Sequence, residues 1–217
     1  MRLIISGGGS IETSKKVDEF FIELLPKNPR ILYVPHAMRF KKSFEECKKW
    51  FSTFLNQFRI ADFELVEDIS QVTLDQYDAI YIGGGNTFNL LKEIKKTGFD
   101  KKLFAFLQNE GIVYGGSAGG IVLGKTISYC GDENKLDQID LEGLDCVKGY
   151  SFMCHFSNNT TQNGLALGEI PKRLICIPES SGIYYDGKKI KILGNQQVSV
   201  YKDQTKVVLS PGDIFTP

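Results

Sequence analysis

The stretch Tyr114–Thr126, YGGSAGGIVLGKT, matches two functional sequence patterns at once. Its first part, Gly115–Gly119, has the form G-x-S-x-G, the sharp strand-to-helix turn that presents a nucleophilic serine. Its second part, Gly119–Thr126, has the form G-x-x-x-x-G-K-T, the loop that binds nucleotide phosphates through backbone N–H groups. Both motifs follow a strand and open a helix, so both predict an α/β fold. They predict different chemistry.

The residues around this stretch alternate between short apolar runs and amphipathic segments. The apolar runs RLIISG, RILYVP, DAIYIGGG and IVYGGS predict strands. SKKVDEFFIELL is typical of a helix with Ser14 as its N-cap, and NTFNLLKEIKKTG is typical of a helix that starts at Asn86 and ends at Gly98. This alternation predicts a mostly parallel sheet sandwiched by helices. Towards the C-terminus, RLICIPE, GIYYDGKKIKILG and QVSVYKDQTKVVLS predict antiparallel strands at the end of the same sheet. No linker or repeat divides residues 1–217, so one domain is expected.

Composition excludes several classes of function. Lys+Arg and Asp+Glu number 26 each, and no basic cluster predicts binding to nucleic acid. No apolar run is long enough to span a membrane, and the N-terminus has the pattern of a strand, so a cytoplasmic protein is expected. The five cysteines are odd in number and lack C-x-x-C spacing, which favours free thiols over disulfides or zinc: Cys47, Cys130, Cys146, Cys154 and Cys176.

The serine turn fits the quoted stretch better than the phosphate loop does. The interior of a phosphate loop would be Gly120–Leu123, GIVL, and its bulky apolar side chains suit a tight curl around an anion poorly. Ser117 has small neighbours on both sides, as a strained turn requires, and the N–H of Ala118 could stabilise an oxyanion. A second oxyanion N–H could come from the loop Gly83–Gly85, which includes Gly84. An inert glycine-rich turn is the alternative.

A serine nucleophile needs a base, and the chain has two histidines, His36 and His155. His155 is favoured because apolar residues surround it and the polar run 157–160 follows it. An acidic partner would fix the tautomer of the histidine. Glu179 ends an apolar strand, where an unpaired carboxylate is costly, and Asp132 lies between the serine and the histidine. Glu179 is the first candidate and Asp132 the second.

Four motifs in this order resemble peptidase E: YIGGGNTFNLL, YGGSAGG, HFSNN and IPESSGI. Peptidase E is a family of serine dipeptidases, family S51, to which cyanophycinases are related. The resemblance extends over essentially the whole chain. It implies a fold like that of the class I glutamine amidotransferases, with serine in place of their cysteine.

The resemblance also implies roles for individual residues. Ser117 would be the nucleophile and His155 the base, with Gly85 and Ala118 near the oxyanion hole. Glu179 and Asp132 both match acidic positions of the family. Members that cleave after an N-terminal aspartate carry an arginine-containing segment soon after the histidine. This chain has NNTTQNGLALGEIPKRL there, without arginine until Arg173, so aspartyl specificity is not expected.

The sequence therefore predicts a serine peptidase that acts on small peptides through an acyl-enzyme, without metal or cofactor. The expected partner is a small peptide, with neither nucleic acid nor membrane involved. A homodimer is one option that the sequence leaves open. A nucleotide-binding protein that uses Gly119–Thr126 and a catalytically silent binding module are the alternatives.

Overall fold

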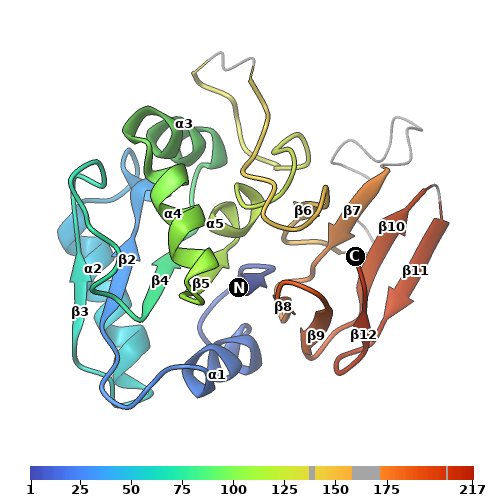
Figure 1. Cartoon of the computed structure of the whole chain (residues 1–217), viewed down its shortest axis with the longest axis horizontal. Coiled ribbons are helices and arrows are strands. Elements are labelled where there is room, and N and C mark those ends of the chain that lie inside the picture. The colour runs from blue at the N-terminus through green and yellow to red at the C-terminus, as the bar shows by residue number, and fades with distance from the viewer. Residues whose placement is uncertain (137–139, 158–171, 204) are drawn as a thin grey trace.

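A large, mostly parallel sheet lies at the centre of the protein (Figure 1). The computed structural model describes residues 1–136, 140–157, 172–203 and 205–217, and within these ranges the sheet has eight strands in the order β12-β9-β8-β1-β5-β4-β2-β3. Five neighbours run parallel: β1 (Arg2–Ser6), β5 (Ile112–Gly116), β4 (Ala79–Ile82), β2 (Ile31–Val34) and β3 (Phe63–Leu65). The rest are antiparallel: β8 (Ser181–Tyr185), β9 (Ile190–Gly194) and β12 (Ile214–Phe215). The predicted α/β class is confirmed.

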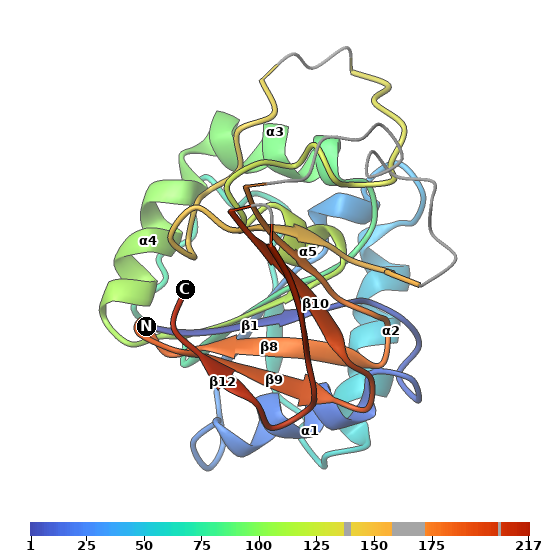
Figure 2. The same ribbon diagram turned by 90° about the vertical axis from the view of Figure 1, so that its right-hand side faces the viewer.

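Helices cover both faces of this sheet (Figures 1 and 2). Alternate residues of a strand point to opposite faces. On β2, Ile31 and Tyr33 pack with α1 and α2, whereas Leu32 and Val34 pack with α3, α4 and α5. The helices are α1 (Lys15–Glu23), α2 (Phe44–Asn56), α3 (Thr87–Thr97), α4 (Phe99–Gln108), α5 (Ala118–Ile121) and the 3₁₀ helix η1 (His36–Met38). None of the helices described here is long and apolar enough to cross a membrane.

A second sheet packs beside the first, on the right of Figure 1. Its strands are β11 (Thr205–Leu209), β10 (Val198–Lys202), β7 (Arg173–Cys176) and β6 (Ser151–Met153), in that order. The prediction that all C-terminal strands extend one sheet is therefore wrong for β7, β10 and β11. These strands pair with one another because β6 supplies an edge, and their buried residues Ile175, Val198 and Val200 join the core of the main sheet.

Two predicted helix starts differ in their chemistry. Asn86 precedes α3 and its side chain accepts a hydrogen bond from the N–H of Asn89, as expected of a cap. Ser14 precedes α1, but its hydroxyl makes no bond to the first turn of backbone N–H groups. It donates instead to the carboxylate of Asp18, at 2.6 Å. The hydroxyl of Tyr114 on β5 donates to the same carboxylate, and this second bond ties α1 to the main sheet.

Candidate active site

Ser117 stands at the sharp turn between β5 and α5. Its backbone angles are φ 49° and ψ −115°, a conformation that non-glycine residues rarely adopt. Gly119, two residues on, is required by close packing, since a Cβ there would lie 2.2 Å from the carbonyl oxygen of Ile82. The Ser117 N–H donates to the Ser6 carbonyl at 3.2 Å. The turn therefore fixes the serine at the carboxyl end of the central strands, where open α/β sheets bind ligands.

His155 and Glu179 reach the same place from the second sheet. They follow the parallel strands β6 and β7, whose register pairs Met153 with Cys176, so both loops leave the sheet at the same edge. His155 has φ 53°, and its N–H donates to the carbonyl of Gly7 at 2.8 Å. The histidine is thus bonded directly to the loop that follows β1 of the main sheet.

The three side chains form one continuous hydrogen-bonded row. The Oγ of Ser117 lies 2.7 Å from Nε2 of His155, and Nδ1 of His155 lies 2.8 Å from Oε1 of Glu179. With the ring proton on Nδ1, the carboxylate accepts that proton's hydrogen bond and Nε2 accepts from the serine. This is the geometry in which an imidazole can take a proton from a serine hydroxyl. Half of the His155 side chain is exposed, so the row is open to a substrate.

Asp132, the second acidic candidate, lies at the start of α3. Its carboxylate accepts hydrogen bonds from the N–H of Thr87 at 2.8 Å and from the Thr87 hydroxyl at 2.5 Å. The adjacent carbonyl of Glu133 accepts from the side chain of Asn86. Within the ranges that the structure describes, Asp132 makes no hydrogen bond to His155. Asp132 therefore anchors the first residue of α3, which follows closely after the Gly83–Gly85 loop.

His36, the other histidine, is buried within the fold. It is 1% exposed, and its Nε2 lies 3.1 Å from the carbonyl oxygen of Glu67. Burial lowers the pKa of the imidazole below its ordinary value. Among the described residues, His36 forms no hydrogen bond with Ser117.

The backbone groups expected to stabilise an oxyanion lie around the serine. Ala118 follows it directly and begins α5. Gly84 lies so close that a Cβ there would be 3.2 Å from the Ser117 Cβ and 3.7 Å from its Oγ. Gly85 follows with φ 141°, and a Cβ there would lie 2.4 Å from the carbonyl oxygen of Ala37. Ala118 and the Gly84 loop therefore flank the hydroxyl.

A third glycine loop, Gly7–Gly9, packs against the same residues and was not singled out from the sequence. A Cβ on Gly8 would lie 2.5 Å from Cε1 of His155 and 3.1 Å from Cβ of Ser117. A Cβ on Gly9 would lie 3.1 Å from that of Glu179. The signal was present, since SGGGS ends a buried strand just as the other two glycine clusters do.

A cavity of about 280 Å³ opens beside Ser117 and extends along the α1 and α2 face of the sheet. Aromatic rings of three strands and of α2 form much of its wall: Tyr33, Trp50, Phe54, Tyr81 and Tyr114. Asp18 also lines it, together with the serine and His155. Of the polar run 157–160, expected near this site, residues 158–160 lie outside the described residues. Most of the segment that lacks the family's arginine, residues 158–171, lies outside them as well.

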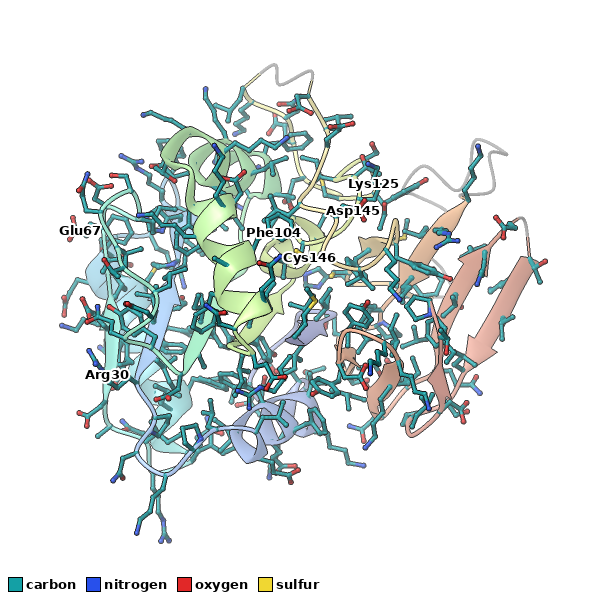
Figure 3. The ribbon with its side chains drawn as sticks, in the orientation of Figure 1. Arg30, Glu67, Phe104, Lys125, Asp145 and Cys146 are labelled. Atoms are coloured by element: carbon teal, nitrogen blue, oxygen red, sulfur yellow. The ribbon has the colours of Figure 1, made fainter. Side chains whose placement is uncertain are left out.

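Residues 120–126 of the alternative phosphate motif form hydrogen bonds with their own chain. Their N–H groups donate to backbone carbonyls, except that of Thr126, which donates to the Ser151 hydroxyl. Lys125 is exposed, and its Nζ lies 3.7 Å from a carboxylate oxygen of Asp145. Both side chains are labelled in Figure 3. The curl of inward N–H groups that binds a phosphate is therefore not formed by this segment.

Comparisons with known proteins identify the family of this chain. The model of peptidase family S51 matches residues 2–193, and the chain belongs to that family. Peptidase E of Actinobacillus pleuropneumoniae is 24% identical over 196 residues, which cover 83% of this chain and 82% of that protein. An uncharacterized peptidase of Listeria monocytogenes is 31% identical over 97 residues, 42% of this chain, and the chain spans about half (47%) of that relative's length.

Solved structures confirm the fold. A crystal structure of a peptidase from an acI-B1 Actinobacterium superposes with a TM-score of 0.81 and 18% identity, covering 100% of this chain and 96% of that one. The predicted class I glutamine amidotransferase-like architecture is confirmed, because it is the fold of the peptidase E structures that this chain matches.

Proposed function

We propose that the protein is a serine peptidase that hydrolyses small peptides through an acyl-enzyme. The observation that carries the proposal is the row Ser117–His155–Glu179, with its two contacts of 2.7 and 2.8 Å. Membership of family S51 supports it, since that is a family of peptidases. The cavity beside the serine, about 280 Å³ in volume, supports a substrate of small size.

The reaction would proceed in two halves. In the first, Nε2 of His155 takes the proton of the Ser117 hydroxyl as its oxygen attacks the scissile carbonyl carbon. The resulting imidazolium gives that proton to the leaving amine, and an ester to the serine remains. In the second half, a water molecule loses a proton to the same nitrogen and attacks the ester, and the imidazolium returns that proton to the Ser117 oxygen as the acid leaves. Glu179 stabilises the imidazolium in both halves.

The negative charge of each tetrahedral intermediate would lie between two backbone groups. The N–H of Ala118 is one candidate donor, and the loop that carries Gly84 and Gly85 offers the second. Removing one such donor from other hydrolases costs about 10²–10³ in turnover, so the loop is a substantial part of the proposed machinery.

A fluorophosphonate probe tests the nucleophile directly, because it phosphonylates only an activated serine. We expect labelling of the wild type and none of Ser117→Ala, with an unchanged circular dichroism spectrum as the control for folding. Equal labelling of the two proteins would remove the assignment. Turnover of a panel of dipeptides should then fall by about 10⁴-fold or more in the same variant.

The acyl-side preference is expected to differ from that of aspartyl dipeptidases. Arg173, the first arginine after the histidine, begins β7. Its side chain donates to the carbonyl of Lys148 at 2.9 Å and lies over the ring of Tyr150. None of the described residues that line the cavity is an arginine. Substrates with an N-terminal aspartate should therefore hold no advantage over neutral ones in the dipeptide panel.

A further inference from the structure

The cavity beside Ser117 contains a buried carboxylate that the proposed mechanism does not use. Asp18 projects from α1 and is 2% exposed, yet it lines the cavity together with the serine and His155. The cavity's position is fixed by the sheet, because Tyr114 of β5 lies two residues before Gly116 and shares its face. A substrate held at Ser117 could therefore extend into the cavity and reach Asp18.

The hydrogen-bond partners of Asp18 leave its charge without a counter-ion. The hydroxyl of Ser14 donates to Oδ2 at 2.6 Å, and the hydroxyl of Tyr114 donates to Oδ1 at 2.5 Å. Both donors are neutral, and a carboxylate has about four acceptor positions, so two remain. Across the described part of the chain, Asp18 forms no ion pair. A buried charge without an opposite charge is costly to keep.

The walls of the cavity suit a positive charge. The rings of Tyr81 and Tyr114 are stacked, with centroids 4.4 Å apart. The ring centroid of Trp50 lies 6.3 Å from that of Tyr81. Tyr33 completes this group, 5.8 Å from Tyr81. Aromatic rings attract cations, and several such rings line the cavity beside this carboxylate.

Few other charges face the cavity. Lys42 and His155 are the remaining titratable basic residues among its described lining, and both are exposed. The charge of Lys42 is therefore largely screened by water. Glu19, next to Asp18 on α1, is half-exposed and lies near Lys15. The interior of the cavity consequently carries one negative charge.

We propose that this cavity is a subsite for a positively charged group of the substrate, with Asp18 as its counter-ion. The inference rests on the proposed function, since it makes the bound group part of the peptide that Ser117 cleaves. The group is an ammonium or guanidinium. It comes either from a basic side chain on the acyl side of the scissile bond or from a free α-amine.

The pKa of Asp18 agrees with this assignment. Burial raises the pKa of the carboxyl to about 6, and the hydrogen bonds from Ser14 and Tyr114 oppose that rise. The group is therefore still mostly ionised at neutral pH. A cation in the cavity would stabilise the ionised form further.

If Asp18 had only a structural role, it would tie α1 to the sheet and would not distinguish charged from uncharged ligands. The test must therefore measure how binding depends on the charge of the ligand. We would measure binding to Ser117→Ala, which leaves peptides intact, by calorimetry with four dipeptides: lysyl-alanine, norleucyl-alanine and the N-acetyl form of each. Norleucine has the alkyl chain of lysine without its ammonium. The side-chain and α-amine contributions are thus separated by comparison within the set.

The same four peptides are then measured with Asp18→Asn added. With Asp18 present, we expect either the side-chain ammonium or the α-amine to strengthen binding about 10- to 100-fold, as charge-assisted hydrogen bonds do. With asparagine in its place, the ratio of the affinities of charged and uncharged peptides should fall to about one. Glu19→Gln, which removes a neighbouring exposed charge, is the matched control and should retain the preference. Thermal unfolding of each variant reports its folding.

Two results would overturn the inference. One is binding that depends on neither charge; the other is a charge preference that survives in Asp18→Asn. The fluorophosphonate probe, applied to a protein that retains Ser117, separates this outcome from failure of the proposed function. Labelling of Ser117 without any charge preference would leave the peptidase and remove the subsite. A charge preference without labelling of Ser117 would keep the binding site for the positive charge and remove the proposed peptidase activity.

Discussion

Replacing Gly8 with alanine tests whether the loop after β1 sets the distance between the base and the nucleophile. Gly8 has φ 88°, and a Cβ added to it would lie 2.5 Å from Cε1 and 2.7 Å from Nε2 of the His155 ring. Ordinary van der Waals contact begins at 3.4 Å. The ring must therefore move by about 1 Å, or the loop must shift by as much.

The consequence follows from the distance that is disturbed. Nε2 of His155 is 2.7 Å from the Ser117 Oγ, and a displacement of about 1 Å takes it beyond hydrogen-bond range. Misplacing a catalytic group by that amount costs about 10²-fold in rate. The alanine also adds backbone strain of about 1–2 kcal/mol, because L-residues disfavour positive φ. For a chain of this size, that strain lowers the melting temperature by about 2–8 °C.

Gly212→Ala provides the matched control. Gly212 has φ 95°, but a Cβ there would meet nothing within 4 Å. Both variants should lose thermal stability to backbone strain, measured by circular dichroism, and Gly8→Ala should lose more because its methyl group also displaces the His155 ring. Fluorophosphonate labelling should slow about 100-fold in Gly8→Ala and stay at the wild-type rate in Gly212→Ala. If the two variants label equally fast, the loop does not control the catalytic distance and the reasoning fails.

Three further carboxylates give distinct outcomes. Glu179→Gln should lower kcat/KM for a dipeptide about 10³–10⁴-fold with little change in melting temperature, because it removes the charge beside His155 but little packing. Asp132→Ala removes two hydrogen bonds to Thr87, so it should lower the unfolding free energy by about 1–2 kcal/mol and slow labelling less than Glu179→Gln does. Asp18 should lower the unfolding free energy by about 3 kcal/mol as pH rises from about 4 to above 6, because only the folded chain keeps that proton in this window. Urea unfolding of Asp18→Asn should lack that loss, and an identical pH dependence in both proteins would contradict it.

The sequence predicted those parts of the fold that depend on local pattern. Apolar runs ending in glycine located the parallel strands, and Asn86 and Gly98 marked the two ends of α3. Small residues around Ser117 predicted the turn because the backbone conformation there tolerates few others. Each of these features is decided by a few neighbouring residues.

Features that depend on long-range pairing could not be predicted in the same way. Nothing in RLICIPE shows that β7 pairs with β6 and leaves the main sheet, although that pairing brings His155 and Glu179 together. For the same reason the sequence left Asp132 open as the acid. Asp18 lies beside the buried residue Val17 on an amphipathic helix, where a carboxylate is usually at the solvent edge. Only the fold shows that it faces a cavity.

The proposed site is assembled across the junction of two sheets, and this has a consequence for mutations elsewhere. Ser117 belongs to the main sheet, whereas His155 and Glu179 belong to the second. The junction is close, since a Cβ on Gly7 would lie 2.0 Å from the carbonyl oxygen of Pro178. The thiol of Cys154 is buried there and lies 3.5 Å from the carbonyl oxygen of Ser6.

Packed interfaces of this kind transmit displacements because they have few voids to absorb them. A bulkier residue at the junction should therefore lengthen the Ser117–His155 contact even though it touches neither side chain. The glycines of SGGGS are then explained by more than turn geometry. Their missing side chains allow the two sheets to approach closely enough for a hydrogen bond of 2.7 Å between them.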